Sequence, residues 1–205
     1  LQLAYDDGIR SIAIVLMHGY RVHKHEKEIA EMARKIGFGQ ISTSHETSSM
    51  IKFVGRGDTT VADAYLSPIL RRYIDCLATD LSGSAQTKLQ MMQSNGGLTD
   101  AALFQGKDAI LSGPAGGIVG AVKTANQAGF EKVITFDMGG TSTDVAHYDG
   151  SYERVFDTMV AGVRIHAPML LINTVAAGGG SLCRFDNGRF QVGPQSAGAN
   201  PGPAC

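Results

Sequence analysis

The spacing of apolar residues in the first part of the chain predicts alternating strands and helices. Residues 11–17 form a continuous apolar run with β-branched members, which predicts a strand buried on both faces. Apolar residues at helical spacing follow in 22–36, and Gly37 is a typical helix stop. The same spacing in 58–81 predicts a longer helix, which we expect Pro68 to kink or interrupt. This order of elements is typical of an α/β domain.

The pattern changes near residue 130, where short β-rich segments and turn signals replace the helices. We therefore expect residues 1–130 to be the C-terminal part of an α/β domain with a connecting helix, and residues 131–205 to begin a second domain. The later elements are expected in this order: a strand at 88–93, a helix from Ser112 to about Gly129, strands at 133–136 and 145–148, a hairpin signal at Asp149-Gly150, a returning strand at 152–159, and a second hairpin with Asp186-Asn187-Gly188 at its tip.

Charge and composition narrow the range of partners. The 18 basic and 19 acidic residues leave a net charge of −1, and no block of like charges occurs. Such a balance carries no electrostatic signature of nucleic acid or of an anionic membrane surface. The sequence also contains no apolar run long enough to span a bilayer. We therefore expect neither nucleic acid nor membrane as a partner, and a local site for a small substrate.

The cysteines and histidines show no metal-binding pattern. Cys76, Cys183 and Cys205 are scattered, and an odd number of cysteines does not build a disulfide framework. This usage is typical of a reducing compartment, so we expect a cytoplasmic protein. The histidines without metal-ligand spacing are His18, His23, His25, His45, His147 and His166.

The two ends of the sequence read as interrupted elements. The chain opens at Leu1, without a methionine, within a predicted helix, and it closes at 201–205 within a predicted loop. We therefore expect an internal fragment of a longer polypeptide, and we expect the isolated fragment to be inactive.

The strongest chemical signal is the segment 136–145, which reads Phe-Asp-Met-Gly-Gly-Thr-Ser-Thr-Asp-Val. A predicted strand delivers Asp137 at its end, and Asp144 enters the next strand. Between them, glycines can point backbone N–H groups at an anion, and hydroxyl groups can donate to phosphate oxygens. A carboxylate there would repel bare phosphate, so Asp137 makes sense when it holds a cation, most naturally hydrated Mg²⁺. The candidate phosphate-binding residues are Gly139, Gly140, Thr141, Ser142 and Thr143.

An ordinary hairpin turn is the alternative interpretation of this segment, with glycines for conformation and Asp and Thr for turn hydrogen bonds. A two-residue turn needs only one or two such residues, and 136–145 contains far more. The segment is also not a P-loop, because no Gly-Lys-Ser/Thr follows and the predicted element is strand–turn–strand. We therefore favour a phosphate-binding loop.

Three further glycine clusters are candidates for ligand contact. Asn95, in the segment 94–97, follows a predicted strand, where α/β folds place binding loops, but a tight turn explains it equally well. The cluster at 112–120 begins a helix whose N-terminus attracts anions, although close helix packing explains its glycines slightly better. Consecutive glycines cost conformational entropy that a simple turn rarely needs, so we expect the third cluster to approach nucleotide or substrate. Its residues are Gly178, Gly179, Gly180 and Ser181.

The Asp-x-Gly-Gly-Thr-x-Thr-Asp pattern of 137–144 resembles the phosphate motif of the actin/hexokinase/Hsp70 ATPase superfamily. This resemblance implies an α/β fold with two ribonuclease-H-like domains, ATP in the cleft between them, and a related hairpin in each. One such hairpin is present in this sequence, so its partner is expected upstream of Leu1.

Five motifs occur in a fixed order: Met-Gln-Ser-Asn-Gly-Gly-Leu at 92–98, Leu-Ser-Gly-Pro-Ala-Gly-Gly at 111–117, the segment 136–145, Asn-Thr-Val-Ala-Ala-Gly-Gly-Gly-Ser at 173–181, and a Gly- and Pro-rich run at 193–205. Together they resemble the hydantoinase A/5-oxoprolinase family over nearly the whole chain. The Asn-Thr-Val-Ala-Ala version of the fourth motif is similar to the 5-oxoprolinase branch.

The family resemblance implies ATP-dependent hydrolysis of a cyclic amide. In the expected reaction, 5-oxo-L-proline becomes L-glutamate while ATP is cleaved to ADP and phosphate, a step of glutathione metabolism. The resemblance also implies Mg²⁺ held by Asp137, phosphate bound by 139–143, and Asp144 orienting the loop or a water. The expected partners are the cyclic amide and either the remainder of the polypeptide or a hydantoinase-B-like subunit, in a homo-oligomer when intact. The alternatives are an ATP-dependent hydantoinase (N-methylhydantoinase), an acetone-carboxylase-like subunit and a non-catalytic actin-like nucleotide-binding module.

Overall fold

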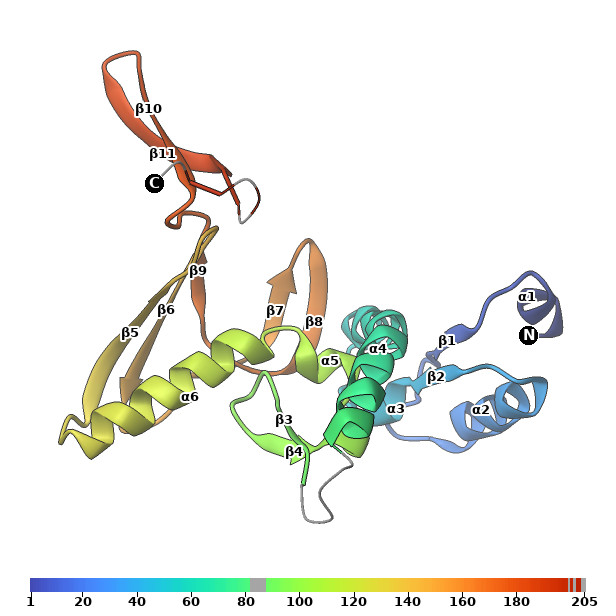
Figure 1. The fold of residues 1–205 in the computed structure, drawn as a ribbon. Helices are drawn as coiled ribbons and strands as arrows, with labels where there is room; N and C mark the ends of the chain where they lie inside the picture. The colour runs from blue at the N-terminus through green and yellow to red at the C-terminus, as the bar shows by residue number, and fades with distance from the viewer. Residues whose placement is uncertain (82–87, 199, 201, 204–205) are drawn as a thin grey trace. The chain divides into compact units, whose positions relative to one another are not determined.

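The computed structural model describes residues 1–81, 88–198, 200 and 202–203. The chain divides into two compact units (Figure 1), the first comprising 1–112 with 155–169 and the second 113–154 with 170–205. The domain boundary that the sequence predicts near residue 130 falls inside the second unit and stays a prediction. Of the end expected to be interrupted at 201–205, residues 201, 204 and 205 lie outside the described residues.

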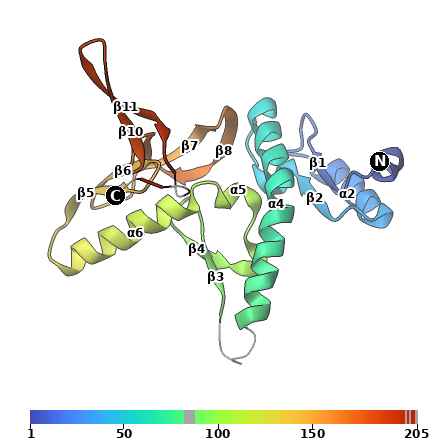
Figure 2. The ribbon, with the colours of Figure 1, turned by 45° about the horizontal axis from the view of Figure 1, so that its top comes forward.

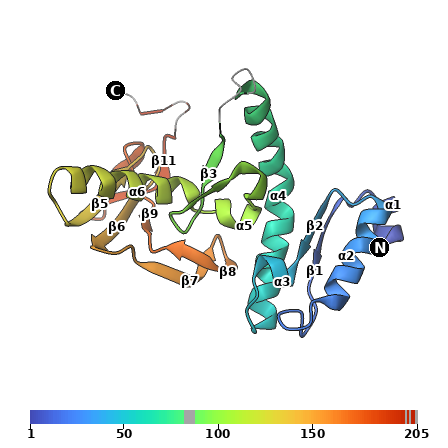
Figure 3. The same cartoon turned by 90° about the horizontal axis from the view of Figure 1, so that it is seen from below.

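The first unit is built around a β–α–β arrangement. β1 (Ser11–Ile14) and β2 (Gln40–Thr43) pair in parallel. They are connected by α2 (Lys24–Ile36), which ends as predicted at Gly37, a residue with a left-handed φ of 112°. Figures 2 and 3 show the two strands between α2 and α4 (Phe53–Leu81).

Two of these elements differ from the sequence expectations. β1 is shorter than the predicted strand at 11–17, and only Ile14 in it is buried, because the sheet has two strands in the part of the chain that the structure describes. The helix α4 runs through Pro68 without interruption. Proline has no N–H to donate to the C=O of Ala64, four residues earlier. Ser11 Oγ donates to that carbonyl instead, which joins β1 to the helix.

The first unit is held together by two clusters of buried apolar side chains. One contains Ile74 and Phe104, and the other contains Ile165 and Met169. The remaining elements of this part of the fold are α1 (Gln2–Asp6), α3 (Ser44–Thr47), β3 (Gln90–Met92), β4 (Leu98–Asp100), the 3₁₀ helix η1 (Ala101–Leu103), α5 (Gly106–Ala109), β7 (Arg154–Val160) and β8 (Val163–Leu170).

The predicted return of strand 152–159 along its predecessor is wrong. β7 pairs with β8 instead, and an isolated bridge between Tyr148 and Tyr152 marks where the chain leaves β6 (Thr143–Asp149). The free edge of β6 is taken by β9 (Asn173–Val175) in antiparallel pairing. Spacing along the sequence could not indicate this, because β9 comes after both β7 and β8.

The second unit contains an antiparallel sheet with a helix on one face. β5 (Lys132–Met138), β6 and β9 pair in that order. The helix α6 (Ser112–Gln127) packs on the sheet through Ala115, Ile118 and Val122. The opposite face of β5 is exposed and carries Ile134, Phe136 and Met138.

The hairpin predicted near the end of the chain is confirmed. β10 (Ser181–Asp186) and β11 (Arg189–Ser196) pair in antiparallel fashion. Asn187 and Gly188 form the turn with positive φ values of 48° and 76°, as the Asp-Asn-Gly signal predicts. Among the helices that the structure describes, none is long and apolar enough to cross a membrane.

Candidate functional site

The β5–β6 hairpin carries the predicted phosphate-binding segment at its turn. Asp137 and Asp144 are register partners on the two strands, so their side chains leave the sheet on the same face. Both line a cavity of about 210 Å³ together with Pro114 and Gly117 of α6. A Cβ on Gly117 would lie 3.4 Å from Asp137 Oδ2. The absence of a side chain at this glycine therefore lets the carboxylate approach the N-terminal half of the helix.

Two carboxylates on one cavity wall are a suitable donor set for Mg²⁺, which proteins bind through one or two carboxylates, with waters and phosphates as further ligands. Asp137 is exposed, whereas Asp144 is half-buried and accepts a hydrogen bond from Thr174 Oγ1 (2.6 Å). Within the described residues, no group of three or more His, Cys, Asp or Glu side chains could hold a metal. A cation at this cavity would therefore need further oxygen ligands from water or phosphate. The metal role of Asp137 stays a prediction.

The hydroxyl of Thr143 makes a hydrogen bond within the protein. Thr143 is buried, and its Oγ1 donates to the C=O of Ala177 over 2.6 Å. A hydroxyl has one proton to donate, so it cannot donate to a phosphate while this bond is made. The Thr143 hydroxyl therefore anchors the hairpin in this structure, and its predicted contact with phosphate stays a prediction. Thr141 is exposed and Ser142 is half-buried, and their phosphate-binding role also stays a prediction.

The triple-glycine segment that was expected to approach a ligand lies against the turn itself. The N–H groups of Gly179 and Gly180 donate to the C=O groups of Gly139 (2.9 Å) and Gly140 (2.7 Å). A Cβ on Gly178 would lie 2.6 Å from the Gly139 oxygen, and one on Gly180 would lie 3.0 Å from the Gly140 oxygen. Glycine is needed at both positions because two backbones meet there directly.

This contact orients the amide groups of the turn. In a trans peptide the C=O and the N–H point in opposite directions. Because the carbonyls of Gly139 and Gly140 point at the triple-glycine segment, the N–H groups of Gly140 and Thr141 point away from it. Ser181 closes the segment, since its Oγ accepts a hydrogen bond from the N–H of Gly178 (2.8 Å).

The glycines of the turn have no comparable packing reason. A Cβ on Gly140 would meet nothing within 4 Å, and one on Gly139 would meet the Ser142 oxygen at 3.6 Å, an ordinary contact. Neither glycine has a positive φ. Glycine therefore supplies open backbone at these two positions, as an anion-binding turn requires.

The candidate residue Asn95 belongs to the first unit, whereas the hairpin belongs to the second. It lies in the turn between β3 and β4, where its Oδ1 accepts a hydrogen bond from the N–H of Gly97 (2.7 Å) and Gly96 has a φ of 82°. This Asx turn accounts for the Asn-Gly-Gly sequence without a ligand. A ligand role for Asn95 stays a prediction.

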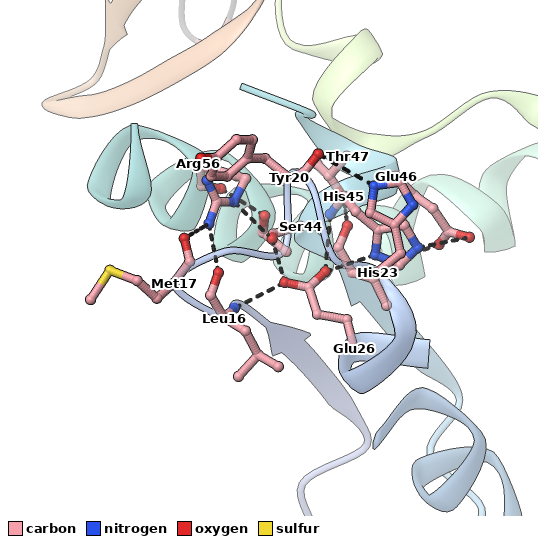
Figure 4. Close-up of polar contacts among 12 residues, drawn as sticks. Leu16, Met17, Tyr20, His23, Glu26, Ser44, His45, Glu46, Thr47 and Arg56 are labelled. Atoms are coloured by element: carbon pink, nitrogen blue, oxygen red, sulfur yellow. Dashed lines mark hydrogen bonds and ion pairs between the residues drawn. The ribbon is translucent and has the colours of Figure 1, made fainter. Parts of the chain in front are cut away.

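The first unit contains a buried polar cluster that was not predicted from the sequence (Figure 4). The Glu26 carboxylate accepts hydrogen bonds from Ser44 Oγ (2.6 Å), His45 Nδ1 (2.7 Å) and the backbone N–H groups of Leu16 and His45. Burial by itself raises the pKa of this carboxyl, but the hydrogen bonds outweigh it and hold the pKa of Glu26 below its ordinary value. Gly19 is required beside it, because a Cβ there would collide with Glu26 Oε1.

Arg56 completes this cluster and is fully buried. Its guanidinium donates to Ser44 Oγ (2.9 Å) and to the backbone carbonyls of Leu16 (2.6 Å) and Met50 (2.7 Å). It thereby ties the loop after β1 to the loop before α4 (Figure 4). The sequence offers no signal for this role, because Arg56 precedes the helix predicted at 58–81.

Comparison with known proteins decides the family. A model of the hydantoinase/oxoprolinase family matches residues 56–205, and a model of the hydantoinase/oxoprolinase N-terminal region matches residues 1–37. The chain belongs to the hydantoinase/oxoprolinase family. The resemblance based on five ordered motifs is thereby confirmed.

This hydantoinase/oxoprolinase chain is similar to longer proteins along almost its whole length. It is 49% identical to the 5-oxoprolinase of Saccharomyces cerevisiae over 207 residues, which covers 100% of this chain and 16% of that protein. The crystal structure of ATP-dependent caprolactamase from Pseudomonas jessenii matches with a TM-score of 0.83 and 36% identity over 98% of this chain and 30% of that one. Nucleotide-free acetone carboxylase matches with a TM-score of 0.76 and 26% identity over 95% and 29%. The mixed α/β fold is therefore shared with both enzymes.

Proposed function

We propose that this hydantoinase/oxoprolinase chain supplies a phosphate-binding part of an enzyme that hydrolyses 5-oxo-L-proline to L-glutamate while ATP is cleaved to ADP and phosphate. The observation that carries the proposal is the β5–β6 turn. The N–H groups of Gly140 and Thr141 face away from the segment that holds the turn, and Asp137 and Asp144 line one cavity. Similarity to proteins named 5-oxoprolinase and ATP-dependent caprolactamase supports amide hydrolysis driven by ATP.

The chemistry explains why such an enzyme needs a phosphate site. A five-membered lactam is a resonance-stabilised amide, and its carbonyl carbon is a poor electrophile. Phosphorylation of the amide oxygen removes this resonance and makes attack by water feasible. The protein must then hold the γ-phosphate against the amide oxygen and stabilise the charge on the transferred group.

The residues of the hairpin have distinct roles in this proposal. The amides of the turn and the hydroxyls of Thr141 and Ser142 bind phosphate oxygens. Asp137 holds Mg²⁺ directly or through water, and the bound ion neutralises charge on the phosphoryl group. Asp144, fixed by Thr174, orients the loop or a water. The triple-glycine segment acts by positioning the turn.

We further propose that the chain is part of an actin/hexokinase/Hsp70-like ATPase, in which residues 131–205 begin a ribonuclease-H-like domain. The antiparallel order β5-β6-β9 with an Asp/Gly/Thr turn supports this assignment. A second phosphate hairpin then comes from the remainder of the polypeptide. The same proposal includes a hydantoinase-B-like part, fused or separate, in a cytoplasmic homo-oligomer.

An ATP-dependent hydantoinase or a carboxylase-like subunit is the second candidate, because acetone carboxylase shares the fold. A substrate comparison in the whole protein separates the candidates. With ATP and Mg²⁺ present, we expect 5-oxoproline to raise ADP release and to yield an equal amount of L-glutamate. Faster ADP release with hydantoin, or with acetone and bicarbonate, would favour the second candidate. Binding of ATP without turnover of any of these compounds would indicate a non-catalytic module.

A further inference from the structure

The β10–β11 hairpin of the second unit has an apolar face. Side chains two residues apart in a strand point to the same side, and the register places Phe185 opposite Phe190 and Cys183 opposite Val192. These four side chains therefore share one face of the hairpin. The two phenylalanine rings lie against each other, with their centroids 5.0 Å apart.

The opposite face of the hairpin is polar. It carries Arg184 opposite Gln191 and Asp186 opposite Arg189, and all four residues are exposed. Such an alternation of apolar and polar side chains is typical of an antiparallel sheet that has one face in water and the other packed against a second layer. The pattern therefore predicts a layer over the apolar face of the hairpin.

No part of the second unit that the structure describes forms this layer. Phe185 is 66% exposed, Phe190 is 86% exposed and Val192 is 58% exposed, and Cys183 is exposed as well. The buried apolar cluster of the second unit lies between α6 and the β5–β6–β9 sheet and contains no side chain of the hairpin. Among the described strands, β10 and β11 pair only with each other.

A hairpin in this state is incomplete as a folded element. A two-stranded hairpin is marginally stable in water on its own, and packing against a helix or a further sheet stabilises it. A third strand at either edge would extend the hairpin but would leave the phenylalanines open to water. The element that completes the hairpin therefore lies on its apolar face and presents apolar side chains to it.

The size of the apolar face indicates which partner fits it. A fully buried phenylalanine covers about 150–250 Å², so the face exposes on the order of 400 Å² of apolar surface. A dimer formed through this face alone would bury roughly 800 Å² in total, below the roughly 1,200 Å² of a stable interface between separate proteins. A segment of the same polypeptide needs less area, because its connection to the hairpin gives it a high effective concentration.

The length of the relatives shows how much polypeptide is available for this role. The chain matches the yeast 5-oxoprolinase over 16% of that protein, and it matches the caprolactamase chain over 30%. Most of each relative therefore lies outside the matched region. In a whole protein of comparable length, the remainder of the polypeptide is large enough to cover the hairpin.

We propose that the apolar face of the β10–β11 hairpin is a docking surface for an amphipathic element of the same polypeptide that lies outside residues 1–205. This element packs aliphatic or aromatic side chains on Phe185 and Phe190, while the polar face of the hairpin stays in water. The N–H of Ala197 donates to the C=O of Gly180 (2.7 Å), so the docking surface is joined at its base to the triple-glycine segment. Docking at this face does not depend on the proposed function, because it needs neither nucleotide nor lactam.

Photo-cross-linking in the whole protein identifies the occupant of this face. Phe190→p-benzoylphenylalanine keeps the aromatic ring and makes it photoreactive. We expect a cross-link to a peptide outside residues 1–205, in a product that keeps the mass of one polypeptide chain under denaturing conditions. A product with the mass of two chains, or a cross-link to a peptide within residues 1–205, would overturn the proposal. The matched control is Gln191→p-benzoylphenylalanine, one residue away on the polar face, which should not yield the cross-link.

Thiol labelling of the whole protein tests the covering of the face without a substitution in it. We expect Cys183 to react with N-ethylmaleimide about 10-fold or more slowly than the thiol of an Arg184→Cys variant in a Cys183→Ser background, because the reagent reaches a covered thiol only when the face opens. Equal rates at the two positions would show that the face is open to water and would overturn the proposal. This measurement decides the question if the photoreactive variant fails to fold.

Discussion

Replacing Gly178 with alanine should impair ATP use, although the site of substitution lies outside the phosphate turn. A Cβ at this position would lie 2.6 Å from the Gly139 oxygen, 2.8 Å from the Gly140 carbonyl carbon and 2.9 Å from the Gly140 oxygen. All three are backbone atoms, which cannot move aside as the end of a flexible side chain can. An ordinary Cβ contact begins at 3.4 Å, so the turn and the segment must separate by about 0.8 Å.

The expected loss follows from this displacement. A shift of about 1 Å in a catalytic site can lower the rate about 100-fold. We therefore expect Gly178→Ala to lower kcat/KM for ATP by about 10- to 100-fold, which corresponds to about 1.4–2.7 kcal/mol. The matched control is Gly179→Ala, because its Cβ would have the Gly139 oxygen as nearest neighbour at 3.8 Å and its φ is not left-handed. This variant should stay within about twofold of wild type.

The assay is steady-state ADP release by the whole protein at saturating 5-oxoproline, with ATP varied. The far-ultraviolet circular dichroism of both variants should match wild type, because the required shift is confined to one turn. If Gly178→Ala were as active as Gly179→Ala, the triple-glycine segment would not hold the turn in its working position. The N–H groups of Gly140 and Thr141 would then not depend on this segment for their orientation.

Three further predictions concern other parts of the chain. Asp137→Asn should lower ATP-dependent turnover about 10²- to 10³-fold, with an unchanged melting temperature, because the near-isosteric change removes only a charge; unchanged turnover would contradict the metal role. The pKa of Glu26 is lowered, so its stabilising contribution is present above the ordinary value of 4.5 and is lost as pH falls through the folded value. Hydrogen-exchange protection of the Leu16 and His45 amides, corrected for intrinsic rates, should therefore fall in acid. Glu26→Gln should abolish this pH dependence. An identical pH dependence in the variant would show that the Glu26 carboxylate does not cause it. The isolated 205-residue chain should form no glutamate from 5-oxoproline, since it spans 16% of the yeast relative; turnover equal to that of the whole protein would contradict the need for a second hairpin.

The β5–β6 hairpin could be predicted from the sequence because its signals are local, whereas its phosphate-binding role stays a prediction. A strand pattern, two glycines and a second strand pattern lie within 136–145, and the structure pairs Asp137 with Asp144 accordingly. The use of the Thr143 hydroxyl could not be predicted, because its acceptor Ala177 is 34 residues away in the sequence. Side-chain hydrogen bonds over such separations depend on strand pairing that no local pattern reveals.

The buried cluster of the first unit was partly accessible from the sequence. Glu26 shares one face of the predicted helix with Ala30 and Ala33, and all three are buried. A charged residue on an apolar face is a signal for a buried partner. The pairing of His166 with Asp157 gave no comparable signal, because it depends on β7 pairing with β8 rather than with β6.

The register of β9 brings the turn glycines, Gly139 and Gly140, against the triple-glycine segment 178–180. Asp144 pairs with Thr174, and Thr143 pairs with Val175. The chain that leaves β9 therefore reaches the turn with Gly178 three residues later, where the backbones meet. A slip of one residue would send the Thr174 side chain to the other face of the sheet, away from Asp144. The same register thus sets the hydrogen bond from Thr174 to Asp144. It also sets the contact between the triple-glycine segment and the turn, which points the N–H groups of the turn away from that segment. The orientation of the N–H groups in the turn, and with it the proposed anion binding, consequently depends on a segment that lies outside the turn.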